Sequence, residues 1–229
     1  MAKVKFSALI SEMRNKLNGS VFSRNRGGAY LRTKVTPVNP STSAQVAARS
    51  LLASFSQGWR GLTQAQRDAW NAAVSQWTTT DVFGDSITPS GNQLYIRLNI
   101  NISIAGGSAI TTPPQPIGIV ALTDLSVTAA EGTPAFDVAF AASPIPADQA
   151  MILEATPALS PGITNANSEF RKISTVAAAE TTPYDALTEW QAKFGSLVQG
   201  QKVFVRAKMF SLLTGEVSQS LQASTVISA

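Results

Sequence analysis

The side chains with the clearest capacity for chemistry are the cations near the amino terminus. Residues 1–60 contain ten Lys or Arg and one acid, Glu12, whereas residues 61–229 contain eight basic and thirteen acidic side chains. A net charge of +9 is therefore followed by one of −5. Arginine presents a planar fork of N–H donors that matches carboxylate and phosphate oxygens. This asymmetry predicts a molecule whose amino-terminal end attaches to an acidic surface.

Seven residues are the candidates for that attachment. Six are cations of the basic segment, and one belongs to the Asn39-Pro40 corner, which directs the chain out of that segment. They are Arg14, Arg24, Arg26, Arg32, Lys34, Asn39 and Arg49. We expect these groups to contact a protein partner, with exposed backbone groups of the segment pairing with the partner as a strand would.

Two other interpretations of the basic segment stay open. It could be a solvated tail that only aids solubility. It could also follow the phosphates of a nucleic acid, but Phe22 and Tyr30 are too few aromatic partners for a base-stacking platform. Docking on an acidic protein lattice is therefore preferred, and no nucleic-acid partner is expected.

Catalytic chemistry is not expected. The chain has no Cys and no His, so it lacks thiolate nucleophiles, the usual zinc ligands and the commonest proton-transfer group. No two carboxylates are closer in sequence than Asp81 and Asp85, which flank Gly84 in a loop, and that spacing is too common to indicate an acid–base pair. Gly106-Gly107 lacks the third glycine of a dinucleotide fingerprint. The sequence thus predicts no enzyme, no cofactor and no metal site.

Composition and hydropathy bound the class of protein. With 229 residues, 44% of them hydrophobic, the chain is long enough to bury substantial cores. The apolar stretch at residues 6–10 is shorter than the roughly 7 residues of a secretory core and the roughly 18 of a membrane span. We therefore expect synthesis in a cytoplasm and no membrane partner.

The sequence predicts an α+β fold made of three parts, the first of which carries most of these cations. Residues 1–40 predict an extended basic arm, with short strands at 19–23 and 29–35 around a turn at 24–28. Residues 41–110 predict a small helical unit. Residues 111–229 predict an all-β sandwich of the immunoglobulin or fibronectin type.

The helical unit is indicated by a change to a 3.6-residue period. One helix is expected from a cap at Ser41, Thr42 or Ser43 to about Gly61, and a second from Thr63, which forms a capping-box pattern with Gln66. The short connection predicts an antiparallel helical hairpin. Its seam would be an aromatic core of Phe55, Trp59, Trp70 and Trp77.

Residues 90–104 fit two patterns. Alternating Leu and Ile favour a strand, whereas the Ser90 and Gln93 capping box favours a helix, which is narrowly preferred. Residues 105–116 have the composition of a linker. Apolar, β-branched runs follow at 117–128, 135–141, 150–155, 170–176, 202–210 and 216–227, and a short helix is expected at Leu187–Phe194.

Three segments of the sequence resemble a known group of proteins. They are Arg24-Asn25-Arg26-Gly27-Gly28-Ala29-Tyr30-Leu31-Arg32, then Pro37-Val38-Asn39-Pro40-Ser41-Thr42-Ser43-Ala44-Gln45 with Arg49, and Trp59-Arg60-Gly61-Leu62-Thr63-Gln64-Ala65-Gln66-Arg67-Asp68-Ala69-Trp70-Asn71. This order resembles virion-associated proteins of tailed phages and prophages of Bacteroidota, over about residues 14–104. The C-terminal part is similar only in general terms to immunoglobulin-like domains of phage capsid and tail proteins.

The resemblance implies a structural role in a phage particle. It points to an auxiliary, or decoration, capsid protein of a crAss-like phage, made in the bacterial host cytoplasm and located in the virion. The major capsid protein or another virion structural protein would be the partner, and homo-oligomerisation stays open. Alternatives are a tail, collar or head–tail connector protein, a packaged DNA-binding protein, or a host-surface or carbohydrate-binding module. For that module the sandwich loops near Gly132, Asn165 and Gly215 would form the site, although they hold few aromatic residues.

Overall fold

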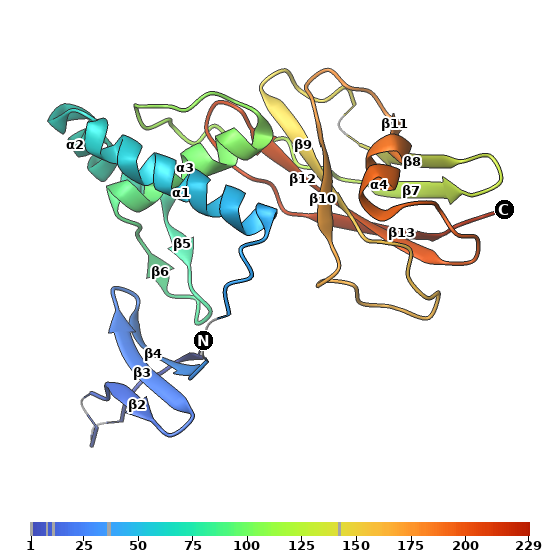
Figure 1. Ribbon diagram of the computed structural model, residues 1–229. Coiled ribbons are helices and arrows are strands. Elements are labelled where there is room, and N and C mark those ends of the chain that lie inside the picture. Colours follow the sequence, from blue (N-terminus) through green and yellow to red (C-terminus); the bar gives the residue numbers. More distant parts are fainter. Residues whose placement is uncertain (1, 8, 11, 36–37, 142) are drawn as a thin grey trace. The chain divides into compact units, whose positions relative to one another are not determined.

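The computed structural model describes residues 2–7, 9–10, 12–35, 38–141 and 143–229 (Figure 1). It is an α+β fold with an N-terminal four-stranded antiparallel sheet, a helical middle and C-terminal antiparallel sheets. The chain divides into two compact units. Unit 1 comprises residues 1–50 and 79–87, and unit 2 comprises residues 51–78 and 88–229. Thr36 and Pro37, near the end of the predicted arm, lie outside the described residues.

Unit 1 corrects the prediction of an extended arm. Its strands β1 (Ala2–Lys3), β2 (Asn15–Leu17), β3 (Ser20–Asn25) and β4 (Gly28–Thr33) form one sheet in the order β1-β4-β3-β2. The strands predicted at 19–23 and 29–35 are confirmed, whereas β1 and β2 were not predicted. The chain can reverse tightly because Asn18 and Gly28 adopt positive φ angles of 51° and 104°. A hairpin of β5 (Thr79–Thr80) and β6 (Ser86–Ile87) completes the unit.

The predicted helices are present, and their caps explain their bounds. Helix α1 spans Ser43–Gly61, and the Thr42 hydroxyl accepts a hydrogen bond from the Gln45 backbone N–H (3.3 Å). Helix α2 spans Gln64–Ala73 behind the predicted Thr63 capping box and continues as the 3₁₀ helix η1 (Val74–Trp77). Helix α3 (Gly91–Ala105) confirms the helical interpretation of residues 90–104, with its capping box at Ser90 and the left-handed Gly106 after its last turn.

The aromatic core needs this third helix, which corrects the two-helix seam. Trp70 and Trp77 are buried, and Phe55 and Trp59 are half-buried against the same cluster. Its centre is Tyr95 of α3: the rings of Phe55, Trp59 and Trp70 lie 6.4, 5.6 and 5.4 Å from its ring. Two amphipathic helices expose too much apolar surface alone, and α3 covers it with Leu94, Tyr95 and Leu98.

The C-terminal part consists of two antiparallel sheets. One has the order β10-β9-β12-β13 and the other β11-β8-β7. The strands are β7 (Leu125–Ala130), β8 (Ala135–Phe140), β9 (Gln149–Ala155), β10 (Arg171–Val176), β11 (Tyr184–Asp185), β12 (Lys202–Ser211) and β13 (Leu221–Val226). Six of them match the predicted runs, although the first begins at Leu125 and not at residue 117. The two-residue strand β11 was not predicted.

One hydrophobic core lies between these sheets. In β12, Val203, Val205 and Ala207 are fully buried in it, whereas Arg206 and Lys208 point the other way. Helix α4 (Leu187–Phe194), found where it was predicted, contributes Trp190. That ring stacks on Phe136 at 5.6 Å, and its indole N–H donates to the Thr156 carbonyl (3.0 Å).

Helix α3 also packs on the C-terminal sheets, so the helical middle beyond residue 50 and these sheets belong to one unit. Ala105 joins Ala150, Ile152 and Phe210 in a small apolar cluster. Gly215 has a positive φ of 73°, and a Cβ there would lie 2.5 Å from the Leu98 carbonyl oxygen. In the described part of the chain, no helix has the length and apolarity needed to cross a membrane.

Candidate functional site

The N-terminal sheet carries a row of cations on one face. Residues that pair across strands point to the same side of a sheet. Lys16 lies opposite Val21, and Val21 lies opposite Arg32. Lys34 follows β4, and its backbone N–H donates to the Gly19 carbonyl (2.8 Å), which continues the pairing and puts Lys34 on the side of Arg32. We call Lys16, Arg32 and Lys34 the basic face.

The opposite face of the sheet carries three large apolar side chains beside polar residues and Arg24. Phe22 pairs with Leu31 of β4 on one side and with Asn15 of β2 on the other. Leu17 lies two residues after Asn15 in β2 and therefore points to the same face. Phe22 and Leu31 are half-buried, and the Leu17 residue is 61% exposed. Among the described residues of unit 1, no hydrophobic side chain is buried. The sheet therefore lacks a core of its own within that part of the chain.

Glu12 forms ion pairs with two of the seven candidate residues, Arg14 and Arg24. The Arg14 Nε and Nη2 atoms lie 2.9 and 2.8 Å from Glu12 Oε1, and Arg24 Nη1 lies 3.6 Å from the same oxygen. The hydrogen bond from Arg14, together with the charges of Arg14 and Arg24, lowers the pKa of Glu12. These two arginines are therefore already paired with a carboxylate inside the chain.

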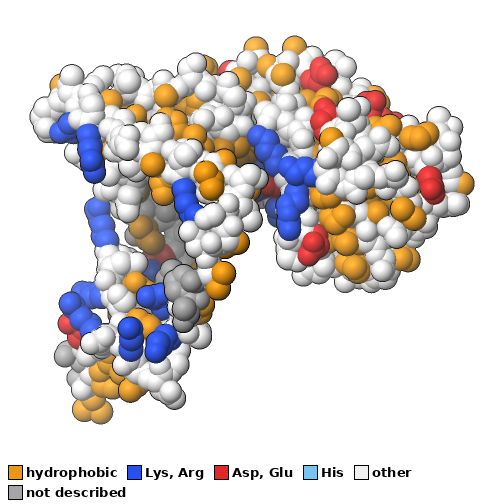
Figure 2. Space-filling view, viewed as in Figure 1, with side chains coloured by type: hydrophobic (Ala, Val, Ile, Leu, Met, Phe, Trp, Pro, Cys, Tyr) orange, Lys and Arg blue, Asp and Glu red, His pale blue; other side chains and the backbone are white. Residues whose placement is uncertain are grey.

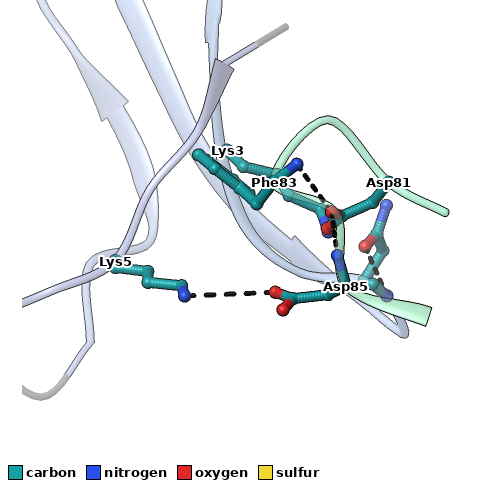
Figure 3. A network of polar contacts seen from close by, with 7 residues as sticks. Lys3, Lys5, Asp81, Phe83 and Asp85 are labelled. Atoms are coloured by element: carbon teal, nitrogen blue, oxygen red, sulfur yellow. Dashed lines mark hydrogen bonds and ion pairs between the residues drawn. The ribbon is translucent and has the colours of Figure 1, made fainter. Parts of the chain in front are cut away.

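The hairpin of β5 and β6 presents two more carboxylates to the start of the chain (Figure 3). Lys3 forms an ion pair with Asp81, whose side chain is only 2% exposed. The other Asp81 oxygen accepts hydrogen bonds from the backbone N–H groups of Phe83 (2.7 Å) and Asp85 (3.1 Å). This arrangement fixes the loop in a tight turn whose carboxylate faces β1.

A second, weaker contact lies beside the first. Lys5 Nζ lies 4.0 Å from Asp85 Oδ2, with both side chains mostly exposed. The ammonium groups of Lys3 and Lys5 each lie 5.7 Å from the Phe83 ring centroid. Asp81 and Asp85 are thus counter-charges for amino-terminal lysines. Sequence reasoning missed this use, because positions 3 and 81 are far apart along the chain.

The seven candidates fall into three groups. All seven are exposed, as docking requires. Arg14 and Arg24 are paired with Glu12, and Arg49 donates to the Asn39 side-chain oxygen at 2.7 Å. Arg26, Arg32 and Lys34 form no ion pair with any described residue.

Sequence reasoning also missed Lys16. The exposed Lys16 lies on the basic face, and within the described chain it has no carboxylate partner. Only the register of β2 against β3 places it beside Arg32. The alternation of Lys16 with Leu17 was the one local signal for a strand there.

A shallow hollow of about 520 Å³ lies beside the Glu12 cluster. Its wall combines charged side chains with apolar ones, so it suits the side chain of a protein partner better than a bare ion. The lining residues are Lys5, Phe6, Ser7, Ile10, Glu12, Arg24, Gly28 and Ala29.

The two units differ in net charge. Unit 1 holds nine basic and three acidic residues, a net charge of +6, and unit 2 holds nine basic and eleven acidic residues, a net charge of −2. Each of the three acids of unit 1 lies in an ion pair with a cation of that unit. In Figure 2, blue side chains accordingly predominate over red ones on the visible face of the N-terminal sheet.

Within the described residues, no group of three or more Asp and Glu side chains could hold a metal ion. The sequence matches no model of a known protein family, and no curated protein is similar enough to count as a relative. The charged N-terminal sheet is therefore the candidate site on its own chemistry.

Proposed function

We propose that this chain is a structural component of a bacteriophage virion, an auxiliary capsid protein that docks on the head shell through its N-terminal sheet. The observation that carries the proposal is the charge balance of unit 1. Its three acids are paired internally with Lys3, Lys5, Arg14 and Arg24. Five cations of the unit are then left for an acidic partner, namely Lys16, Arg26, Arg32, Lys34 and Arg49. The resemblance of residues 14–104 to phage virion proteins names the kind of assembly.

The sheet offers backbone pairing as well as charge. Strand β2 lies at one edge, and its three residues are exposed. At the other edge, Ala2 and Lys3 of β1 pair with Leu31 and Tyr30 of β4. A partner strand could add to either edge while arginine forks engage its carboxylates.

The C-terminal part fits a fibronectin-type sandwich in this proposal. Of its seven strands, the first, second and fifth form one sheet and the others form the second. In immunoglobulin constant-type domains the fourth strand lies with the first sheet, whereas here β10 pairs with β9, as in fibronectin-type domains. Such a domain would project from the shell.

Two observations argue against the alternative binding functions. Tyr30 pairs with Ser23, the residue after Phe22, and successive residues of a strand point to opposite faces. Phe22 and Tyr30 therefore lie on opposite faces of the sheet and cannot form one base-stacking surface. The loop at Gly215 packs against Leu98 of α3, and Asn101 donates to its carbonyl (2.9 Å). That loop is therefore engaged within unit 2 and is poorly suited to a host ligand.

Copy number in purified particles tests the proposal. Quantitative mass spectrometry should find this chain at hundreds of copies per particle, as an icosahedral shell requires, and about a dozen would indicate a collar or tail ring. Absence from the particle would contradict every virion function considered for it.

A charge variant tests the docking surface itself. The double substitution R32E/K34E should lower incorporation at least about tenfold, because a like-charge contact replaces an attractive one. The control R60E/K202E changes the net charge equally but lies in unit 2, and it should be incorporated normally. Equal incorporation of both variants would locate the contact elsewhere.

A further inference from the structure

The C-terminal sheets carry two charged surfaces of opposite sign, both within unit 2. On the outer face of β10, β9 and β12, Lys172 lies opposite Glu154, and Glu154 lies opposite Arg206. Arg206 holds Glu154 through two nitrogens, each 2.6 Å from the same oxygen. Lys172 is exposed beside this pair and has no ion-pair partner of its own among the described residues.

A second lysine concentrates the positive charge. Lys193 of α4 is exposed, and its ammonium group donates to the Lys172 carbonyl (2.9 Å). Lys172 in turn donates to the Ile104 carbonyl (3.1 Å). Burial, and then the charge of Lys193, lower the pKa of Lys172, and the charge of Glu154 acts in the opposite direction. We call Lys172 and Lys193 the lysine patch.

The negative surface lies on the other sheet. Asp137 of β8 pairs directly with Asp185 of β11, and both point away from the core because Phe136 and Val138 point into it. Asp185 also accepts a hydrogen bond from the Leu187 backbone N–H (2.9 Å). In the described chain, neither aspartate has a cationic partner. We call Asp137 and Asp185 the aspartate patch.

Each patch alone is unfavourable. Asp137 and Asp185 are like charges directly opposite each other on neighbouring strands, an arrangement that destabilises a sheet. In the lysine patch the charge of Lys193 acts against the charge of Lys172, and Glu154 opposite Lys172 offsets part of that repulsion. Each repulsion is relieved when a surface of the opposite sign covers the patch. Both surfaces occur on the same chain but on different sheets, so a neighbouring copy supplies the complement to one patch through its own patch of opposite sign.

We propose that two copies of this chain associate through their C-terminal sheets, with the lysine patch of one copy on the aspartate patch of the other. This contact is separate from the N-terminal docking surface. It would join neighbouring subunits laterally, whatever the assembly that they occupy.

Association of the purified full-length chain tests this contact. Sedimentation equilibrium should show self-association at about 50 mM salt that weakens at about 500 mM, because added ions screen exposed charge pairs. K172E/K193E and D137K/D185K should each weaken association at least about tenfold. An equimolar mixture of these two variants should associate again, since one carries two negative patches and the other two positive ones.

Further variants exclude indirect effects. R60E/K202E changes the net charge as much as K172E/K193E does, but neither residue belongs to either patch, so this variant should associate like the original chain. D137N/D185N keeps the acceptor for Leu187 while removing both charges, so it should associate weakly and remain folded by circular dichroism. A monomeric original chain at low salt, or a mixture that stays monomeric, would overturn the proposal. Loss in K172E/K193E without loss in D137N/D185N would also overturn it and assign the lysine patch to another anionic partner.

Discussion

At the scale of single residues, Glu12 decides how many arginines are available. It pairs with Arg14 and Arg24. Arg26 in the β3–β4 turn and Arg32 in β4 have no carboxylate partner in the described chain. Free carboxylates of a partner would have to displace Glu12 before they could bind Arg14 or Arg24. Arg26 and Arg32 meet no such competition, so we expect them to dominate docking.

The pKa of Glu12 provides a test of this pairing. Because Arg14 lowers that pKa in the folded chain, the pair adds stability above the unfolded pKa and loses it as pH falls through the folded pKa. A carbon-detected NMR titration should give a Glu12 midpoint below the ordinary glutamate value. Arg14→Gln should move the midpoint upward, and an unchanged midpoint would show that the pair does not persist in solution.

Trp70 allows a second residue-scale prediction. It is fully buried, and its indole N–H donates to the Thr111 carbonyl (2.9 Å). Trp70→Ala should lower the free energy of unfolding by about 3–5 kcal/mol, the usual cost of truncating a large buried aromatic side chain. Trp70→Phe keeps a ring against Tyr95 but loses the hydrogen bond, so it should cost less, about 1–3 kcal/mol. Denaturant melts that leave Trp70→Ala unshifted would contradict the core assignment.

At the scale of elements, the N-terminal sheet should be separable from unit 2. Every buried hydrophobic residue of the described chain lies at Leu62 or beyond, in unit 2. Deleting residues 1–34 should therefore preserve the circular dichroism and melting of unit 2 while abolishing incorporation into particles.

The deletion has a specific control. It removes Lys3 and Lys5 and so leaves Asp81 and Asp85 unpaired on their hairpin. The same deletion combined with D81N/D85N removes those unpaired charges and should also fail to incorporate. Recovery of incorporation by the Asn substitutions would mean that stray carboxylates, and not the missing sheet, had blocked docking.

Local signals predicted most elements and missed the ones that depend on distant partners. Capping boxes at Thr63 and Ser90 were readable because both bonds lie within three residues. The hairpin of β5 and β6 has only two residues per strand, too few for a periodic pattern. The arm seemed extended because its strands are short, and only pairing across four of them shows a sheet.

At the scale of the whole molecule, charge is divided between units. The net +6 of unit 1 would attract DNA as readily as an acidic protein if charge alone decided. We predict negligible duplex binding by the purified chain at about 150 mM salt, where exposed charges are screened beyond about 8 Å. A gel shift showing submicromolar binding that strengthens with DNA length would favour a DNA-binding role.

The sequence predicted which cations belong to the candidate site but not how these side chains are placed relative to one another. Charge counting found Arg26, Arg32 and Lys34, because an excess of one sign is visible without a structure. It could not separate them from Arg14 and Arg24, since the neutralising contacts depend on how Glu12 folds back. Lys16 joins the basic face only through strand register, which the sequence does not specify.

The N-terminal sheet, which has no buried hydrophobic side chain among the described residues of unit 1, should be cleaved more readily than unit 2. Short strands without buried apolar side chains are marginally stable in water, so the sheet should open often in the free protein. Trypsin cuts after Lys and Arg and should therefore trim free chains within residues 1–34 well before it reaches unit 2. Docked chains should resist, because a bound partner covers the same bonds. Host proteases would then remove the docking segment from unassembled subunits and spare those already in place.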